Sequence, residues 1–421
     1  MSTLGSPARR WLTDALLYGL SAGFAAVTAV AADIPLQRTW GRTALWGYGV
    51  ATAAAAAASF RRWGEAQEKR SRVLLAIAVF AATALLPLAV AAQLRAEGDP
   101  GDHAQSEVII VEEGAEALFD GRDPYAEEYL EGPLSDRPLA TQIHFPYMPA
   151  MLAFGVPRAL GGHASWADAR VWFTIFSVSI AVASLRRMST SARARVRTLQ
   201  VLFVLPTGAL LLATGGVDIP VLALLLAACM LVQRGEAIGA GLVGGLALAT
   251  KQTSLLVLPF VALAMAAGSE RRRSLATSVL VGVGLAAPFA VWDFGAFVED
   301  TVLFPLNAGH GESAAETPTV GSWLIDLFPA QRVVITAVLV AVVGAVLVLL
   351  VVSGRGSSMS QACTRAAGAF LVAVALAPAA RVGYLVYPVN LIAWAFAFRQ
   401  EEASVALDAT GTSRPDRVRD T

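Results

Sequence analysis

Runs of apolar residues, separated by short polar or basic segments, occupy most of the 421-residue chain. Three of these runs, residues 11–32, 74–94 and 333–352, match the roughly 20 apolar residues that a helix needs to cross a bilayer. No small-residue cleavage site and polar segment follow the first run, so it is predicted to be a retained span and not a signal peptide. The pattern predicts an all-α helix bundle that crosses a membrane several times.

The composition agrees with a membrane protein and excludes several kinds of site. The chain is 56% hydrophobic and only 15% charged, whereas soluble domains carry about 25% charged residues. The formal net charge of +0 gives no support to a nucleic-acid partner. The two cysteines, Cys229 and Cys363, cannot form a disulfide framework or a metal-binding spacing. No metal and no cofactor are predicted.

The distribution of charge along the chain orients the spans. Basic residues gather at 61–72, 186–197 and 271–273, and such segments stay in the cytoplasm. Residues 96–145 instead carry thirteen acidic residues and two arginines, and residues 294–331 carry five acidic residues and no Lys or Arg. These two long loops are predicted to lie outside a cell membrane, with both chain termini in the cytoplasm.

Twelve spans satisfy this orientation, although several are short. They are predicted near residues 11–32, 44–60, 74–95, 166–185, 198–214, 217–233, 237–250, 253–268, 274–293, 332–352, 366–380 and 383–398. Residues 147–160 are too few to span, and a crossing there would move the arginines of 186–197 outside. This segment is therefore predicted to be a juxtamembrane helix on the outer face. The polar tail after Arg399 is predicted to be disordered.

The acidic stretch 107–120 is predicted to form an amphipathic helix at the outer mouth of the bundle. On a helical wheel, Val108, Val111, Ala115, Leu118 and Phe119 share one face. Two glutamates border this face, Glu107 and Glu112, and the wheel does not choose between them. The other acidic residues of the helix, and by preference Glu112 as well, are expected to face water. Gly121 is predicted to end the helix as a C-cap.

Several short motifs follow one another in a characteristic order. Residues 121–125 read Gly-Arg-Asp-Pro-Tyr, residues 144–149 read His-Phe-Pro-Tyr-Met-Pro, and residues 215–218 read Gly-Gly-Val-Asp. Residues 244–252 end in Lys251 and Gln252, and residues 378–388 contain Arg381 and two tyrosines. In this order the motifs resemble GT-C membrane glycosyltransferases. The resemblance is to glycosyltransferase family 87, the polyprenyl-phosphate-mannose-dependent mannosyltransferases of actinobacteria, over roughly residues 74–398.

The resemblance implies the fold, its division and its activity. It implies a GT-C-like bundle of about twelve transmembrane helices, with juxtamembrane helices in the first outer loop. Residues 1–73 would add two helices and a basic loop, residues 74–398 would form the GT-C-like part, and residues 399–421 would be the tail. The expected activity transfers a sugar, mannose by the resemblance, from a polyprenyl-phosphate donor to a lipid or glycan acceptor on the outer face. The expected partners are this donor, this acceptor and membrane lipids.

The resemblance also indicates the catalytic base. In this fold an Asp of the first outer loop takes the acceptor proton, and its distance before the 121–125 motif places that role on Glu107. Glu107 departs from the family's Asp, and Asp102 is the alternative. The departure leaves open that the chain is an altered or inactive member. His310, which lies between two glycines, is a further candidate for the base or for acceptor binding.

The transfer also needs a cation that holds the leaving phosphate. Lys251 and Arg381 are the predicted phosphate ligands, because both are predicted to lie at the outer membrane edge, where a charged residue is costly and usually has a function. Gln252 is a candidate neutral donor beside Lys251. Asp218 is predicted either to cap a helix that begins near Pro220, which is favoured, or to contact the sugar or the acceptor. Tyr147 and His144 are further candidate substrate contacts.

Two other functions are compatible with the spans. A transporter or lipid flippase would explain Lys251 and Asp218 but not the long acidic outer loop. A catalytically silent partner in envelope assembly would explain the glutamate at the base position. An enzyme should place Glu107 or Asp102 at a lipid-accessible cavity near Lys251 or Arg381, whereas a transporter should show a path through the midplane.

Overall fold

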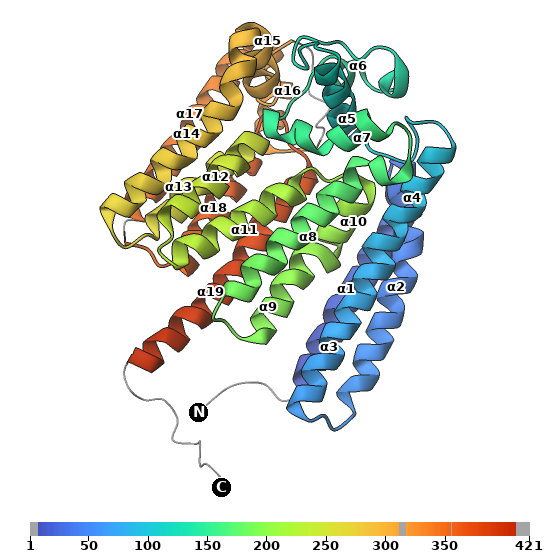
Figure 1. The fold of residues 1–421 in the computed structure, drawn as a ribbon, viewed down its shortest axis with the longest axis vertical. Helices are drawn as coiled ribbons and strands as arrows, with labels where there is room; N and C mark the ends of the chain where they lie inside the picture. The colour runs from blue at the N-terminus through green and yellow to red at the C-terminus, as the bar shows by residue number, and fades with distance from the viewer. Residues whose placement is uncertain (1–6, 311–316, 355, 410–421) are drawn as a thin grey trace.

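The computed structural model describes residues 7–310, 317–354 and 356–409, and the regular elements in these ranges are helices (Figure 1). Seven of these helices are long and apolar enough to cross a membrane, or eight if one bent pair counts as a single span. The predicted all-α membrane bundle is therefore confirmed. The predicted count of twelve spans is not confirmed.

The N-terminal part is a helical hairpin packed on a long third helix. Helices α1 (Pro7–Ala31) and α2 (Pro35–Ser59) lie side by side, and a Cβ at Gly41 would come within 2.5 Å of the Ala29 nitrogen. Helices α3 (Glu65–Phe80) and α4 (Leu86–Glu97) join through a π-helical turn, Ala81–Leu85. Trp40 Nε1 donates to the Thr83 carbonyl at 2.8 Å, which gives this carbonyl of the widened turn a partner.

The segment predicted to be the first outer loop contains several short helices, which lie at the upper end in Figure 1. Helix α5 (Ser106–Phe119) matches the bounds of the predicted amphipathic helix, but Phe119 of the predicted apolar face is 55% exposed, and α6 (Leu139–Gln142) follows it. The predicted juxtamembrane segment at 147–160 is a 3-10 turn, Pro149–Phe154, followed by α7 (Val156–Gly161). These pieces form a small apolar core of their own above the spans.

The central helices surround one fully buried helix. This helix is α11 (Asp218–Gln233), whose residues from Asp218 to Val232 are all buried, as expected for a helix that is apolar on every side. It packs against α8 (Ala169–Arg187), α10 (Pro206–Thr214) and α12 (Ala237–Thr250), and α9 (Ala192–Leu199) precedes α10 in the chain. A π-helical turn, Gln200–Val204, ends before Pro206, and the two halves of this span bend by 41°. Proline has no N–H, so the helix cannot continue regularly through it.

The span predicted at 253–268 is wrong as a continuous helix. It is a 3-10 turn, Gln252–Leu256, and the six-residue helix α13 (Leu258–Leu263). Six helical residues cover only about 9 Å, far less than a bilayer. Pro259 lies at the start of α13, where its missing N–H is tolerated, and this separates α13 from the preceding turn.

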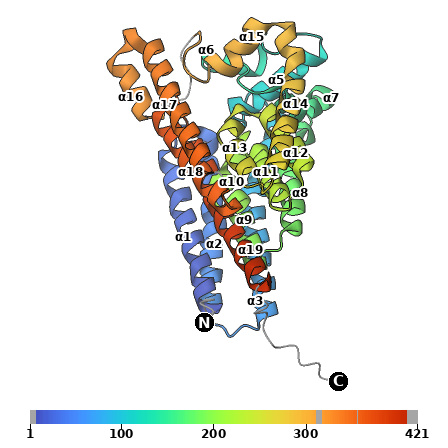
Figure 2. The ribbon, with the colours of Figure 1, turned by 90° about the vertical axis from the view of Figure 1, so that its left-hand side faces the viewer.

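In the described ranges, the C-terminal part consists of four long helices and two short ones, and the short ones lie at the upper end. They are α14 (Gly268–Trp292), α15 (Phe294–Val298), α16 (Val320–Leu327), α17 (Arg332–Ser353), α18 (Met359–Leu376) and α19 (Val386–Ala409). A π-helical turn, Glu299–Leu303, follows α15, and a 3-10 turn, Val382–Leu385, precedes α19. At the upper end, α16 and α17 stand apart from α14 and α15 (Figure 2).

The tail prediction is wrong for residues 399–409, because α19 continues to Ala409. Two carboxylates fasten this end to its neighbours. Glu401 accepts a bond of 2.8 Å from the Ser189 amide, and Glu402 accepts one of 3.0 Å from the Ser360 amide at the start of α18. The rest of the predicted tail, residues 410–421, lies outside the described residues.

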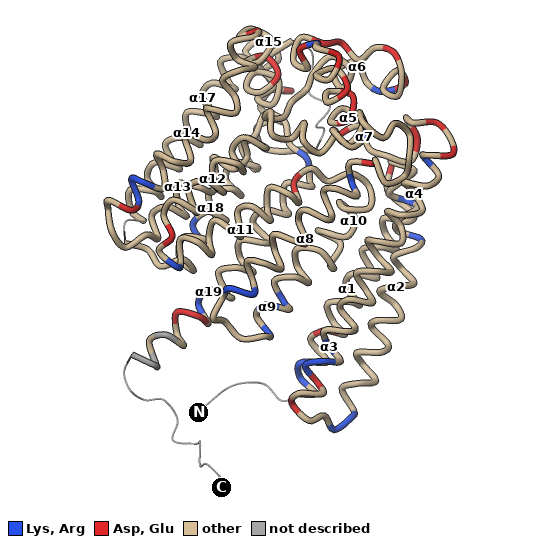
Figure 3. Tube along the Cα trace, viewed as in Figure 1, with Lys and Arg blue, Asp and Glu red and all other residues tan. Residues whose placement is uncertain are grey.

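Charge separates along the long axis of the bundle (Figure 3). Acidic residues gather at the upper end, around α5, α6 and α15, whereas most basic residues lie at the lower end, where α1 begins and α19 ends. The acidic loops predicted to lie outside and the basic segments predicted to lie inside therefore occupy opposite ends. Which membrane face each end occupies stays a prediction.

Candidate functional site

Helix α5 holds Glu107 in place at the acidic end of the bundle because both ends of the helix are fixed. At its start the Gln105 amide donates to the Thr214 carbonyl at 3.1 Å. At its end Gly121 has φ +74, and the Arg122 and Gly121 amides donate to the Ala117 and Leu118 carbonyls. These two bonds form a Schellman motif, which needs a residue in the left-handed region and therefore favours glycine. The predicted C-cap is confirmed.

A cavity of about 540 Å³ opens beneath the outer loops. Its polar end is lined by Glu107, His144, Tyr147, Lys251, Gln252, Arg381 and Tyr384. Its other end is apolar and lies between α17 and α18, where Leu339, Val343 and Leu347 face Phe370 and Val374. From Leu339 to Leu347 the cavity follows α17 for about 12 Å, at 1.5 Å per residue. A ligand that has a polar head and an apolar chain would fit a cavity of this shape.

The structure brings together two predicted site residues that are 274 positions apart. Arg381, in the turn between α18 and α19, donates to the carboxylate of Glu107 and forms an ion pair with it. The Arg381 side chain is 41% exposed and that of Glu107 is 17% exposed. The pair is therefore open to a ligand in the cavity, and its bond is of the strong, charge-assisted kind.

A second ion pair lies deeper. Lys251 Nζ lies 2.6 Å from Asp218 Oδ1, which also accepts a bond of 2.7 Å from the Tyr387 hydroxyl. The Lys251 ammonium lies 5.6 Å from the ring of Tyr147 and 5.2 Å from that of Tyr384. Aromatic faces stabilise a cation at such distances, so Lys251 is held by one carboxylate and two rings.

The favoured role of Asp218 as a helix cap is wrong. Helix α11 begins at Asp218 itself, its N-cap residue is Val217, and no side chain caps its first amides. Asp218 instead neutralises Lys251. The sequence did not reveal this pairing because the two residues are 33 positions apart, Asp218 at the start of α11 and Lys251 just after the end of α12.

His144 connects the two outer loops. Its Nδ1 lies 2.6 Å from Asp300 Oδ1, and its Nε2 lies 3.1 Å from the His310 carbonyl. Asp300 also accepts a bond of 2.7 Å from the Phe145 amide. Burial would lower the pKa of His144, but the hydrogen bond and the charge of Asp300 outweigh burial and raise this pKa above its usual value.

The side chain of His310 does not reach the cavity. It is 89% exposed, and its Nδ1 lies 3.2 Å from Glu299 Oε1. The only link of His310 to the site in the described ranges is its backbone carbonyl, which faces His144. A direct catalytic role for His310 therefore has no geometric support.

Gln252 faces the cavity in a different role from the one predicted. Its Nε2 donates to the Pro146 carbonyl at 3.2 Å and to the Thr301 carbonyl at 3.3 Å, so both donors are used. Its Oε1 is buried and has no hydrogen-bond partner within the described part of the chain. Both donors of Gln252 are therefore taken by the backbone, and its one side-chain polar atom that lacks a partner in the described ranges is a buried oxygen.

Two acidic residues of the first outer loop lie elsewhere than expected. Asp102 is exposed and does not line the cavity. Glu112, expected to face water, is only 1% exposed. It pairs with Arg95 at 2.7 Å and accepts a bond of 2.8 Å from the Ala169 amide at the start of α8.

Glu112 belongs to a buried group of five charged residues, which we call the outer ion cluster. Its members are Arg95, Glu112, Arg158, Asp168 and Arg170. Arg170 also donates to the His103 carbonyl at 2.8 Å and to the Ala213 carbonyl at 3.0 Å. The cluster thereby fixes the turn that precedes α5 and, through it, the position of Glu107. A helical wheel shows neither the arginines of α4 and α8 nor this burial.

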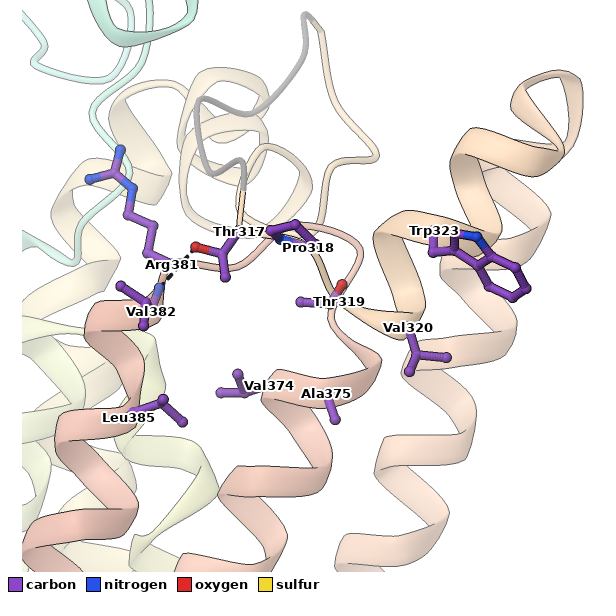
Figure 4. A pocket seen from close by; sticks show the side chains of 10 residues that line it. All are labelled: Thr317, Pro318, Thr319, Val320, Trp323, Val374, Ala375, Arg381, Val382 and Leu385. Carbon is purple, nitrogen blue, oxygen red and sulfur yellow. Dashed lines mark hydrogen bonds between the residues drawn. The ribbon is translucent and has the colours of Figure 1, made fainter. Parts of the chain in front are cut away.

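A second cavity, also of about 540 Å³, lies on the other side of the α18–α19 turn (Figure 4). Thr317, Thr319, Trp323, Val374 and Leu385 are among the side chains around it. Arg381 and Val374 line both cavities. In Figure 4 the guanidinium of Arg381 points away from the second cavity, which leaves that cavity largely apolar.

The described residues contain no group of three or more His, Cys, Asp or Glu side chains that could hold a metal ion. The acids at the candidate site are instead engaged with Arg381, Lys251 and His144. The chemistry offered by these side chains is proton transfer by a carboxylate and the binding of an anion by cations.

Comparison with known proteins gives one family. The sequence profile of glycosyltransferase family 87 matches residues 145–388, more than half of the chain. The match includes Asp218, Lys251 and Arg381. It begins at residue 145 and therefore leaves out Glu107, which precedes it. No curated protein sequence matches the chain. Among solved structures, ArnT from Cupriavidus metallidurans bound to undecaprenyl phosphate is similar, with 16% identity and a TM-score of 0.47. The similarity covers 83% of this chain and 64% of that protein.

Proposed function

Because the chain belongs to glycosyltransferase family 87 and is therefore a membrane glycosyltransferase, we propose that its large cavity binds a polyprenyl-phosphate sugar and transfers the sugar to an acceptor hydroxyl. The observation that carries this proposal is one cavity whose polar end holds Glu107, Arg381 and Lys251 and whose other end is an apolar groove between α17 and α18. A transporter would not need a carboxylate paired with an arginine at an outer mouth. The family assignment also favours transfer over transport.

The donor is placed by its two chemical parts. The polyprenyl chain lies along α17 and α18, where Leu347 and Phe370 line the groove. The phosphate then lies at the polar end, within reach of Arg381 and Lys251. Guanidinium and ammonium groups are the usual ligands of phosphate oxygens.

The reaction forms one bond and breaks one bond. The acceptor oxygen attacks the anomeric carbon, and the bond from this carbon to the phosphate oxygen breaks. The acceptor proton passes to the carboxylate of Glu107, which acts as general base. The products are the glycosylated acceptor, a polyprenyl phosphate with one more negative charge, and a protonated Glu107.

The Glu107–Arg381 pair gives this proton transfer a second effect. Before the reaction the charge of Arg381 is balanced by Glu107. When Glu107 takes the proton, it becomes neutral and leaves Arg381 without a counter-charge. At the same moment the phosphate gains a negative charge. Arg381 can then bind the leaving phosphate more strongly, and such stabilisation at the point where charge develops accelerates a reaction.

The acceptor is proposed to approach from the second cavity. This cavity meets the first at Arg381 and is lined mainly by apolar side chains such as Trp323 and Leu385. An acceptor that carries a lipid chain suits this lining better than a free glycan does. Glu107 lines the first cavity, so the acceptor hydroxyl would have to pass Arg381, which lines both cavities, to reach the carboxylate.

The test is transfer by purified protein in lipid vesicles. Radiolabelled polyprenyl-phosphate mannose is the first donor, followed by other polyprenyl-phosphate sugars, and labelled products are separated from donor by chromatography. A lipid extract from the source membrane supplies acceptors. Label should move to an acceptor with the intact protein and not with Glu107→Gln. If no donor gives transfer while the folded protein still binds the donor, the chain is a silent member of its family.

A further inference from the structure

Helices α1, α3 and α9 bring six charged side chains together at the lower end of the bundle, opposite the candidate site (Figure 3). We call this group the inner basic cluster. Its members are Arg10, Asp14, Glu68, Arg72, Arg193 and Arg197. Four arginines and two carboxylates leave an excess of two positive charges.

Both carboxylates of the cluster are already engaged. Asp14 accepts from Arg72 at 2.6 Å and from Arg197 at 2.9 Å, and it is 1% exposed. Glu68 is also buried and pairs with Arg10 through a bond of 2.6 Å. These two acids therefore hold three of the four arginines.

The cluster also contains donors that have no acceptor. Arg193 has no ion pair or hydrogen bond among the described residues, and the charges that act on it are those of Arg10, Arg72, Glu68 and Arg197. The Nη1 atom of Arg197 is buried and has no hydrogen-bond partner in the described ranges. On the same face of α1 as Asp14, the buried Nε1 of Trp11 likewise lacks a partner there. A buried donor without an acceptor costs about 1–3 kcal/mol, and more when it is charged.

We infer that the inner basic cluster binds a phosphate group, and that this phosphate belongs to the headgroup of an anionic membrane lipid. Guanidinium groups bind phosphate oxygens through paired, directional hydrogen bonds. One phosphate would give an acceptor to Arg193 and to the unpaired Nη1 of Arg197, and it would offset the excess charge. Nothing in the proposed sugar transfer uses this site.

A lipid is favoured over a soluble phosphate by what surrounds the cluster. The outward face of α1 carries Leu12, Leu16 and Leu20, which are 54%, 62% and 64% exposed. Leu12 follows Arg10 by two residues, on the side of α1 turned away from Asp14, so the apolar surface of the bundle begins at the level of the cluster and acyl chains would lie beside it there. Basic segments also predict that this end lies at the cytoplasmic leaflet, whose anionic lipids attract arginines.

The bound lipid would join the N-terminal hairpin to the rest of the bundle. Arg10 lies on α1, whereas Arg193 and Arg197 lie on α9. Only the Asp14–Arg197 bond links these two helices within the cluster. A phosphate held by both helices would add a second link at the same place.

The experiment compares two single variants of the full-length protein. Arg193→Gln removes the guanidinium that has no ion pair, so it breaks no salt bridge of the described structure. Arg272→Gln is the matched control, because Arg272 is exposed at the same basic end of the bundle and lies outside the cluster. Binding of phosphatidylglycerol and phosphatidylcholine to the detergent-solubilised protein is titrated by native mass spectrometry. Inorganic phosphate is added as a competitor in a separate series.

Phosphatidylglycerol should bind wild type and Arg272→Gln equally and bind Arg193→Gln about tenfold more weakly, the effect of one lost charge-assisted contact. Phosphatidylcholine should bind all three proteins weakly. Competition by millimolar inorganic phosphate would support the phosphate site and assign it to a soluble phosphate, whereas lack of competition would assign it to the lipid. Equal phosphatidylglycerol binding by wild type and Arg193→Gln, or equal weakening in both variants, would overturn the inference.

Discussion

Charged side chains at the candidate site come in pairs, and each pair joins distant parts of the sequence. Glu107 meets Arg381, Asp218 meets Lys251, and His144 meets Asp300. Sequence motifs could single out Glu107, Lys251 and Arg381 because a charged residue near a membrane is costly and usually has a function. They could not reveal the pairing, because a contact across 274 positions depends on the whole fold. Asp300 was missed altogether, since it lies in an acidic loop with no motif around it.

The base is tested by Glu107→Gln. We expect it to keep the fold and donor binding but to reduce turnover by about 10²–10⁴-fold, because the amide cannot take the acceptor proton. Glu107→Asp should retain more activity because it keeps the carboxylate. Asp102→Asn is the control, since Asp102 is exposed and outside the cavity, and its activity should match wild type. Steady-state transfer assays measure all three, and full activity in Glu107→Gln would remove Glu107 as the base.

The proposed phosphate ligands, Lys251 and Arg381, are tested by substituting each of them and, separately, Asp218, the partner of Lys251. Lys251→Gln and Arg381→Ala should each weaken donor binding by about 1.5–3 kcal/mol, the size of a charge-assisted contact. Asp218→Asn keeps Lys251 and frees it from its counter-charge, so donor binding should be equal or tighter. Equilibrium binding of a non-transferable donor analogue measures these effects. If Asp218→Asn weakens binding as much as Lys251→Gln does, Lys251 acts only through its ion pair.

At the scale of elements, sequence periodicity located helices well where their ends are marked by local signals. Helix α5 begins within one residue of the predicted start, and Gly121 ends it as predicted. The misplaced elements are those that depend on distant contacts. Helix α19 extends past Arg399 because Glu401 and Glu402 bind to other helices. Glu112 is buried because Arg95 and the start of α8 meet it.

The outer ion cluster is expected to hold α5 in place. Glu112→Gln leaves Arg95 and Arg158 without the carboxylate that they share, and breaking a buried pair costs about 3–5 kcal/mol. Glu116→Gln is the control on the same helix, because Glu116 is only half-buried and takes part in no ion pair of the described structure. Thermal unfolding in detergent should show a lower midpoint for Glu112→Gln alone. Equal midpoints would show that the cluster does not stabilise the loop.

Glu113 makes the stability of this loop depend on pH. Burial, with repulsion from Glu116 and Glu112, raises the pKa of Glu113 to about 7. A carboxyl with a raised pKa favours the folded state while it is protonated, so this contribution should fall as the pH rises from about 4.5 to 7 and be absent above. Over the same range Glu113→Gln should lose less stability than wild type. Unfolding midpoints between pH 5 and pH 8.5 test this, and parallel curves would contradict it.

At the scale of the whole molecule, the sequence predicted the class of fold because apolar length and charge asymmetry are properties of the entire chain. The number of spans was harder to predict from the sequence. Segment 252–263 is as apolar as a span, yet it forms only a 3-10 turn and the short helix α13. Apolar residues line the cavity there as well as the lipid face, and composition alone does not distinguish the two. The family match supports the central part, residues 145–388, and leaves the N-terminal hairpin unassigned.

The orientation of the bundle is open to direct measurement. Basic loops stay in the cytoplasm, so the acidic end with α5 and α6 should face outward and the basic end should face inward. Both natural cysteines are buried, so an impermeant thiol reagent added to intact cells should react only with an introduced cysteine. Asp136→Cys lies exposed in the first outer loop and should be labelled without lysis. Arg272→Cys lies exposed at the basic end and should be labelled only after the membrane is opened. The opposite pattern would place the candidate site in the cytoplasm and would remove an outer-face transfer reaction from consideration.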